Sequence, residues 1–151
     1  MQLVIDANVV ISALATDGAV RTAIRTTTDG VCTPWYIQTE IDNHRTAIRN
    51  KSGLRSQTFD ALIEEFLDSI EIIPHEAMGP HLHDAAREMH AYDPDDTLYV
   101  AAALAVDGTV VSNDQAFEQQ QTVSHIWTSE FVERALGLGD EHSAPTNGDD
   151  S

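Results

Sequence analysis

Cysteine and lysine are almost absent from this chain. One cysteine, Cys32, and one lysine, Lys51, occur among 151 residues. A single thiol excludes an internal disulfide and a cysteine-rich zinc site. Cys32 lies in an apolar segment with no base beside it, so we interpret it as a small buried residue and not as a nucleophile.

Long hydrophobic runs and glycine-rich loops are also missing. No stretch of 18 apolar residues and no basic, apolar leader occurs, so we expect a cytoplasmic protein without a membrane segment. Phosphate-binding P-loops and dinucleotide folds need a glycine-rich loop after a strand, and none is present. A haloacid-dehalogenase-like phosphatase needs an aspartate two residues after Asp6, where Asn8 stands.

Positive charge is scarce. Eight Lys and Arg residues face 25 Asp and Glu residues, which gives a formal net charge of −17. Such a balance ordinarily argues against a polyanionic partner. At ~1 M ionic strength, however, the Debye length is about 3 Å, and surface repulsion is screened. We interpret the acid-rich, lysine-poor composition as halophilic, which leaves nucleic acid open as a partner.

Short apolar runs alternate with helical patterns along the chain. The expected strands are Gln2–Ile5, Val31–Thr33, Glu71–Ile73, Thr109–Val111 and Val123–Trp127. The expected helices are Asn8–Leu14, Ala19–Thr27, Pro34–Asn50 with Thr33 as its N-cap, Ser56–Ile70, His81–Ala91, Leu98–Val106, Asp114–Glu118, and a last one that Thr128 or Ser129 caps and Leu136 ends.

This alternation predicts an α/β fold, a three-layer α/β/α sandwich with a mostly parallel central sheet. Residues 1–136 are expected to form one domain. Residues 137–151 carry almost no apolar side chain and are expected to form an acidic, disordered tail.

Four acidic residues lie near the boundaries of these elements: Asp6, Glu40, Asp96 and Asp114. In open α/β sheets ligands bind at the carboxyl ends of the strands, so acids far apart in the sequence can converge there. Clustered carboxylates repel one another unless a cation or shared protons neutralise them. Each acid alone also fits a surface loop or a helix N-cap, and it is their conjunction that favours one shared site.

The segments around these acids resemble the PIN domain family. Val4-Ile5-Asp6-Ala7-Asn8-Val9 is similar to its opening strand and first acid, and Glu40 stands where the family carries a helix glutamate. Asp93-Pro94-Asp95-Asp96-Thr97-Leu98-Tyr99-Val100-Ala101 is similar to its third acidic block, and Val110-Val111-Ser112-Asn113-Asp114 to its last. The resemblance covers about residues 2 to 133 in order and spacing.

The resemblance implies a ribonuclease dependent on Mg²⁺ or Mn²⁺, often the toxin of a toxin–antitoxin pair (VapC-like). Asp6, Glu40, Asp96 and Asp114 would be both its metal ligands and its catalytic residues, and Asn8, Ser112 and Asp95 would support them. An antitoxin partner and a homodimer follow from the same resemblance. Two alternatives stay open: a housekeeping RNA-processing nuclease, and a non-catalytic module that binds RNA or protein.

The chain departs from the family pattern at one position. Many members carry a further acid two residues after the last one, where this chain has Ala116. Either one metal is held less tightly, or Glu118 or Asp95 compensates. The number of metal ions, and the choice of Asp96 over Asp95 as ligand, therefore stay open.

Basic residues gather in one short segment. Arg45 and Arg49 lie one helical turn apart and are candidates to bind RNA phosphate. Pairing with a neighbouring acid such as Asp42 explains these side chains at least as well.

Overall fold

A single parallel sheet forms the centre of the computed structural model, which describes residues 1–90 and 96–138. Its five strands run in the order β3-β2-β1-β4-β5, and every neighbouring pair is parallel. Their bounds are β1 Gln2–Ile5, β2 Gly30–Pro34, β3 Glu71–Ile73, β4 Thr109–Val111 and β5 Ser124–Ile126.

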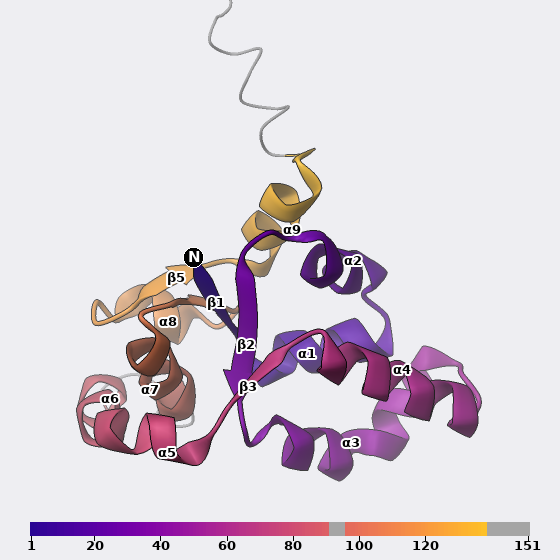
Figure 1. The fold of residues 1–151 in the computed structure, drawn as a ribbon, viewed down its shortest axis with the longest axis horizontal. Helices are drawn as coiled ribbons and strands as arrows, with labels where there is room; N and C mark the ends of the chain where they lie inside the picture. Colours follow the sequence, from indigo (N-terminus) through magenta and orange to yellow (C-terminus); the bar gives the residue numbers. More distant parts are fainter. Residues whose placement is uncertain (91–95, 139–151) are drawn as a thin grey trace, which may run out of the picture.

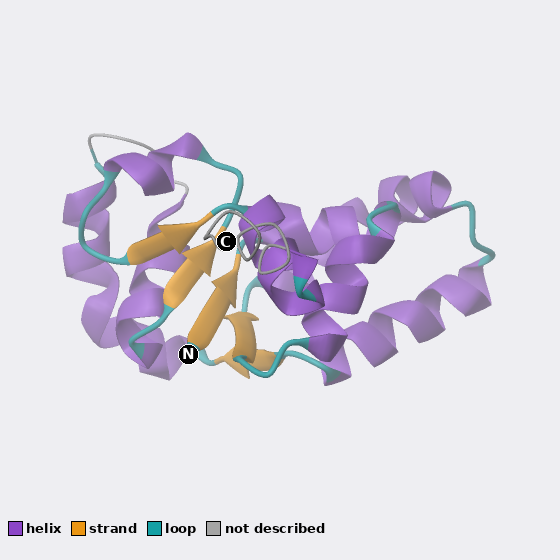
Figure 2. Cartoon of the chain, turned by 90° about the horizontal axis from the view of Figure 1, so that it is seen from above, coloured by secondary structure: helices purple, strands orange, loops and turns teal. Residues whose placement is uncertain are grey.

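Helices connect the strands and cover the sheet on both sides (Figures 1 and 2). Their bounds are α1 Ala7–Ala15, α2 Gly18–Thr26, α3 Ile37–Ser52, α4 Ser56–Asp68, α5 His75–Met78, the 3₁₀ turn η1 Gly79–His81, α6 Leu82–Met89, α7 Thr97–Val106, α8 Gln115–Gln119 and α9 Thr128–Leu136. None of the helices in the described part of the chain combines the length and the apolar character that a membrane crossing requires.

Two hydrophobic clusters lie on opposite faces of the sheet. Leu3 and Ile5 of β1 point into the first cluster, which buries the inner faces of α1, α2, α3, α4 and α9. Val4, between them, points into the second cluster with apolar residues of α5, α6, α7 and α8. Successive side chains of a strand alternate between the two faces, so the short runs of consecutive apolar residues reflect burial on both sides. The three-layer α/β/α sandwich is confirmed.

The strand order places β1 between β2 and β4. Ile5, the last residue of β1, is in register with Val111, the last residue of β4. Asp6 and Ser112 therefore emerge side by side at the carboxyl edge of the sheet, at its topological centre. This is the edge where ligands bind in open α/β folds.

The start of α3 differs from the prediction. Pro34 is the last residue of β2, and α3 begins three residues later, at Ile37. Thr33 does not cap a helix, because its hydroxyl donates to the carbonyl of Ile5 at 2.8 Å. The missing N–H of Pro34 is tolerated at the end of the strand, where the Trp35 N–H donates to the Ile73 carbonyl at 2.9 Å. Proline suits a strand end as well as a first helical position.

Other helix boundaries also differ from the prediction. Thr128 is the first residue of α9 and not its cap, and α4 ends at Asp68, two residues earlier than predicted. The segment after Pro74 forms α5 and η1, which the sequence did not predict. The predicted helix His81–Ala91 is α6, Leu82–Met89, and Ala91 lies outside the described residues.

Candidate active site

Asp6 occupies the centre of the candidate site. It directly follows β1, caps the first turn of α1, and is only 4% exposed. Its Oδ1 accepts the backbone N–H of Asn8 at 3.2 Å, and its Oδ2 accepts the hydroxyl of Ser112 at 2.7 Å. The capping role alone does not require an aspartate, because a serine or a threonine would cap the helix without burying a negative charge.

Ser112 connects Asp6 to Asp114. While its hydroxyl donates to Asp6, the same oxygen accepts the backbone N–H of Asp114 at 2.9 Å. Asp114 in turn caps α8, because its Oδ1 accepts the N–H of Ala116 at 2.9 Å. At the ends of β1 and β4, the fully buried hydroxyl of Ser112 therefore joins the carboxylate of Asp6 to the backbone N–H of Asp114.

The environment of Asp6 opposes its negative charge. Burial raises the pKa of Asp6, and the nearby charge of Asp114 raises it further, while the hydrogen bonds from Ser112 and from the Asn8 N–H lower it. The net shift is upward. A carboxylate in such a setting becomes more favourable when a cation binds beside it.

Tyr99 lies close to Asp6 and to two further acids, Glu40 and Asp96. Its hydroxyl accepts the N–H of Ala7, the first residue of α1, at 3.2 Å. Burial raises the pKa of Tyr99, and the charges of Asp6, Glu40 and Asp96 raise it further, so the phenol stays protonated. Three acids from different elements thus act on one hydroxyl, which the sequence prediction did not single out. Its position three residues after Asp96, on one helix face, was the available signal.

Glu40 and Asp96 come from helices that start at the carboxyl edge of the sheet. Glu40 lies in the first turn of α3, with a side chain 30% exposed, and its Oε2 is 3.9 Å from Nε2 of His44. Asp96 occupies the N-cap position of α7 and is 7% exposed. Asn8 is exposed and contributes its backbone N–H. Asp95 lies outside the described residues.

The donor set suits a hard divalent cation, although no complete cage is formed. Carboxylate oxygens are the ligands that Mg²⁺ and Mn²⁺ prefer. Within residues 1–90 and 96–138, no three His, Cys, Asp or Glu side chains are arranged so that they could hold an ion by themselves. Mg²⁺ commonly binds one or two carboxylates and completes its shell with water and substrate phosphate. Buried Asp6, with Asp114 beside it, fits that mode.

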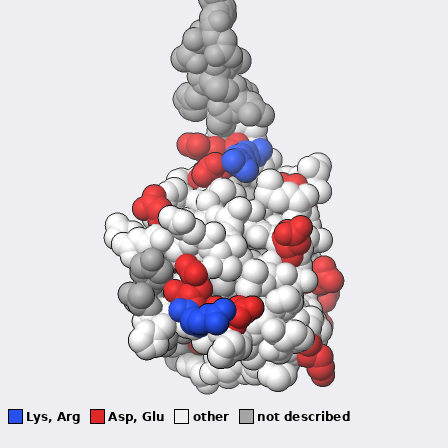
Figure 3. All heavy atoms as spheres, turned by 90° about the vertical axis from the view of Figure 1, so that its left-hand side faces the viewer, with Lys and Arg blue, Asp and Glu red and all other residues white. Residues whose placement is uncertain are grey.

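Arg45 already has acidic partners. Its Nη1 lies 2.7 Å from Oδ1 of Asp60, and its Nη2 lies 3.3 Å from Oδ1 of Asp42. The expected pairing with Asp42 is confirmed. RNA binding by Arg45 and Arg49 stays a prediction. Figure 3 shows another face of the molecule, on which the basic groups likewise lie beside acidic groups.

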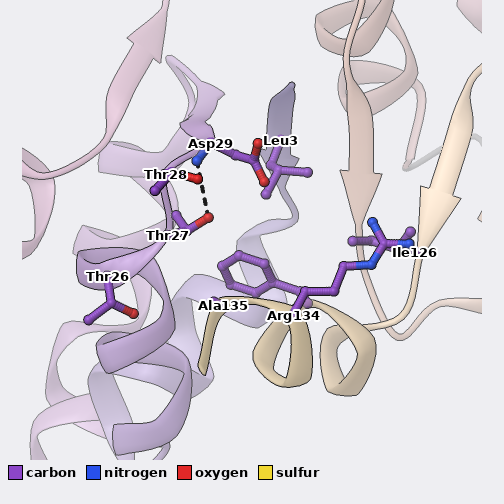
Figure 4. Close-up of a pocket in the computed structure, with 9 residues that line it drawn as sticks. Leu3, Thr26, Thr27, Thr28, Asp29, Ile126, Arg134 and Ala135 are labelled. Atoms are coloured by element: carbon purple, nitrogen blue, oxygen red, sulfur yellow. Dashed lines mark hydrogen bonds between the residues drawn. The ribbon is translucent and has the colours of Figure 1, made fainter. Parts of the chain in front are cut away.

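A pocket of about 200 Å³ lies at the opposite end of the strands (Figure 4). Leu3 and Ile126 line it from the sheet, Arg134 and Ala135 from α9, and Asp29 from the turn that leads into β2. Because Asp29 precedes β2 whereas Asp6 follows β1, this pocket is remote from the four candidate acids. We place the candidate site at the carboxyl edge, where the acids gather.

Solved structures with the same fold include chains of two bacterial complexes. One is the crystal structure of VapBC2 from Rickettsia felis bound to a DNA fragment from their promoter, in which a chain aligns with a TM-score of 0.63 and 14% identity, over 84% of this chain and 98% of that chain. The other is VapBC-1 from nontypeable Haemophilus influenzae, with a TM-score of 0.60 and 12% identity, over 85% of this chain and 99% of that chain. At these identities the likeness concerns the fold.

Sequence comparison gives the family. No curated protein sequence matches this chain. The sequence profile described as PIN domain matches residues 4–136, which include all four candidate acids. On that match, the chain belongs to the PIN domain family.

Proposed function

We propose that this protein is a divalent-metal-dependent ribonuclease and the toxin of a toxin–antitoxin pair. The observation that carries the proposal is the hydroxyl of Ser112, which joins Asp6 and Asp114 at the carboxyl ends of two adjacent central strands. This bridge joins the carboxylate of Asp6 to the backbone N–H of Asp114, so two acidic residues lie close together, where a bound cation would relieve the repulsion between their charges. Membership of the PIN domain family supports the nuclease assignment.

Each acid has a distinct place in the proposed reaction. Asp6, Asp96 and Asp114 would bind Mg²⁺ or Mn²⁺, and Glu40, which is more exposed than Asp6 and Asp96, would bind metal or orient the attacking water. When bound, the metal supplies a water of lowered pKa and stabilises the charge that develops on the phosphate oxygens. Ser112 fixes the orientation of Asp6, and Tyr99 remains a neutral hydroxyl beside the acids. No covalent protein intermediate is required.

The toxin assignment rests on the solved complexes. Both structural relatives come from VapBC assemblies, so we propose an antitoxin protein as partner and retain a homodimer as the proposed state of the free toxin. The two other functions named from the sequence, a housekeeping nuclease and a non-catalytic binding module, are the competing outcomes. No observation on the structure favours either.

Cleavage of a total RNA pool tests the proposal. Wild type, Asp6→Asn and Asp96→Asn are incubated at molar KCl with Mn²⁺ or with EDTA. Asp68→Asn, which removes one exposed charge on α4 far from the site, is the matched control. We expect cuts that need the metal, are lost in both site variants and persist in the control.

Two other results would redirect the assignment. Full activity in Asp6→Asn would remove Asp6 from the site. Inactivity of the wild type in every lane, together with no Mn²⁺ binding by calorimetry, would favour a non-catalytic binding module. Co-purification with the product of an adjacent small gene, and loss of cleavage in that complex, would distinguish a toxin from a housekeeping nuclease.

A further inference from the structure

A groove leads away from the acidic site between α1 and α3. A pocket of about 300 Å³ lies between these two helices. Its lining residues are Asn8, Ile11, Ser12, Ala15 and Thr16 from α1 and His44, Ala47, Ile48 and Lys51 from α3. A second pocket of about 300 Å³ continues it and shares Ala15, Thr16 and Lys51. The two pockets therefore adjoin along α1, and together they are called the groove.

The groove begins at the candidate active site. Asn8, at one end, is the residue whose backbone N–H bonds the carboxylate of Asp6. His44, across from it, lies 3.9 Å from the carboxylate of Glu40. Whatever enters the groove at this end therefore passes directly beside two of the four acids.

The two helices give the groove a mixed chemistry. Ile11, Ala15 and Ile48 supply apolar surface, while Ser12 and Thr16 supply hydroxyls. Lys51, the only lysine of the chain, lies at the junction of the two pockets. It is exposed, and no ion pair within the described residues engages it. At the far end Arg21 adds a second positive charge, while its Nη1 donates to the carbonyl of Ala13.

The opposite face of α3 packs against α4 and not against α1. Residues 44, 47, 48 and 51 follow helical spacing and face α1, whereas residues 38, 41, 42 and 45 line a separate pocket against α4. Arg45 lies on that second face, paired with Asp60 of α4. Lys51, and not Arg45, thus lines the groove that begins next to Asp6 and Glu40.

We propose that this groove binds the single-stranded RNA that runs to the active site, and that Lys51 contacts a backbone phosphate there. The proposal rests on the ribonuclease function proposed above. RNA phosphates bind basic side chains, whereas bases pack on apolar surface and riboses form hydrogen bonds with hydroxyl groups. The chain has a net charge of −17, which repels RNA. A lysine without an ionic partner among the described residues, in a groove beside the proposed nuclease site, gives a local positive charge that attracts the RNA phosphates.

The dimensions of the groove fit a short stretch of RNA. From Asn8 to Thr16, α1 rises about 12 Å at about 1.5 Å per residue. Stacked nucleotides rise about 3.4 Å each, so the part of the groove along α1 accommodates roughly three to four nucleotides. Lys51 then contacts the strand on one side of the cleavage point only, which makes the recognition asymmetric.

Equilibrium binding of a fluorescein-labelled single-stranded RNA tests the proposal without cleavage. Fluorescence anisotropy is recorded in EDTA across a range of KCl concentrations for wild type, Lys51→Gln and Ala47→Glu. Arg55→Gln removes a like charge at an exposed position outside the groove, and Ala61→Glu adds a charge at an exposed alanine of α4. These two are the matched controls, and circular dichroism confirms that all variants are folded.

We expect Lys51→Gln to weaken binding roughly threefold to tenfold at low salt and to reduce the slope of log K against log salt by about 0.7, the value for one lost phosphate contact on a single strand. Ala47→Glu should weaken binding further, whereas both controls match the wild type. Equal affinity and slope in Lys51→Gln and Arg55→Gln would overturn the proposal and leave the groove to a protein partner.

The two proposals fail in different ways. If the wild type cleaves RNA and Asp6→Asn does not, while both groove variants bind RNA as the wild type does, the ribonuclease stands and the groove assignment is wrong. If the wild type neither binds nor cleaves RNA, the ribonuclease function fails, and the groove assignment fails with it.

Discussion

The hydroxyl of Ser112 lies 2.7 Å from Oδ2 of Asp6, although 106 residues separate the two along the chain. Both residues follow the last residue of a strand, and those two strands are neighbours in register. The same hydroxyl oxygen receives the N–H of Asp114. One buried side chain therefore links the carboxylate of Asp6 to the backbone of Asp114 at the sheet edge.

Ser112→Ala should weaken both stability and activity. It leaves a buried carboxylate oxygen without its hydroxyl donor, which costs about 1–3 kcal/mol of unfolding free energy. The pKa of Asp6 should rise further, because the Ser112 hydrogen bond lowers it. We expect the acidic limb of the pH–rate profile to move to higher pH, measured as cleavage between pH 5 and pH 8. Ser124→Ala, at an exposed position of β5, is the control. An unchanged profile would show that Ser112 does not position Asp6.

Asp6→Asn should be more stable than the wild type at neutral pH in EDTA. The folded-state pKa of Asp6 is raised above its ordinary 3.8, so its contribution is most favourable below 3.8 and is lost as pH rises through the raised value. The stability difference between the variants should vanish near pH 4 and grow toward pH 7. Asparagine retains the helix cap. Urea unfolding at several pH values checks this, and a pH-independent difference would contradict it.

Tyr99→Phe tests the hydroxyl at the meeting point of the acids. Its loss leaves the N–H of Ala7, a residue only 5% exposed, without its acceptor, and should cost about 1–3 kcal/mol. Cleavage should fall because the first turn of α1, which Asp6 caps, loses the hydrogen bond that holds it to α7. Tyr36→Phe is the matched control, since Tyr36 is likewise half-buried. Equal stability of the two variants by thermal unfolding would mean that the Tyr99 hydrogen bond is dispensable.

The halophilic interpretation stays a prediction and can be measured directly. With a formal charge of −17, self-repulsion should destabilise the fold at low ionic strength. The melting temperature should rise with KCl, most steeply up to ~0.1 M, where the Debye length falls to about 10 Å. Sucrose, which stabilises without screening charge, serves as the control solute. A melting temperature independent of KCl would refute the interpretation.

The domain boundary at residue 136 is also still a prediction. Helix α9 ends at Leu136, and Gly137 closes it with a φ of 76°. Removal of residues 138–151 should therefore change the unfolding free energy by no more than about 0.5 kcal/mol. Chemical denaturation of the full and shortened chains compares them. A substantially larger loss would show that the domain extends beyond α9.

The sequence predicted the elements whose signal is local. All five strands are short apolar runs between turn residues, and each was recognised. Asp6 and Asp114 were expected near one another because parallel strands end at one edge, and the Ser112 bridge joins the two residues at that edge. Their shared role in a site stays a prediction. Pro34 was misassigned because a proline fits a strand end and a helix start equally well, and only the neighbouring Ile73 decides between them.

The residues that the structure adds to the candidate site and to the proposed groove depend on contacts between distant segments. Tyr99 accepts a hydrogen bond from Ala7, 92 residues away, and its own segment gives no sign of that partner. Lys51 gained significance only when α3 was seen to face α1 along the groove. By spacing alone, Arg45 was the more conspicuous basic residue, yet the fold turns it toward Asp60.

The central position of β1 has a consequence for biosynthesis. The strand made first pairs with β4, whose residues are among the last of the domain to be made. A nascent chain that still lacks β4 has Asp6 but neither Ser112 nor Asp114, so the paired carboxylates do not exist during most of translation. On the function proposed above, the chain would therefore acquire the means to attack RNA only after most of the domain has been made.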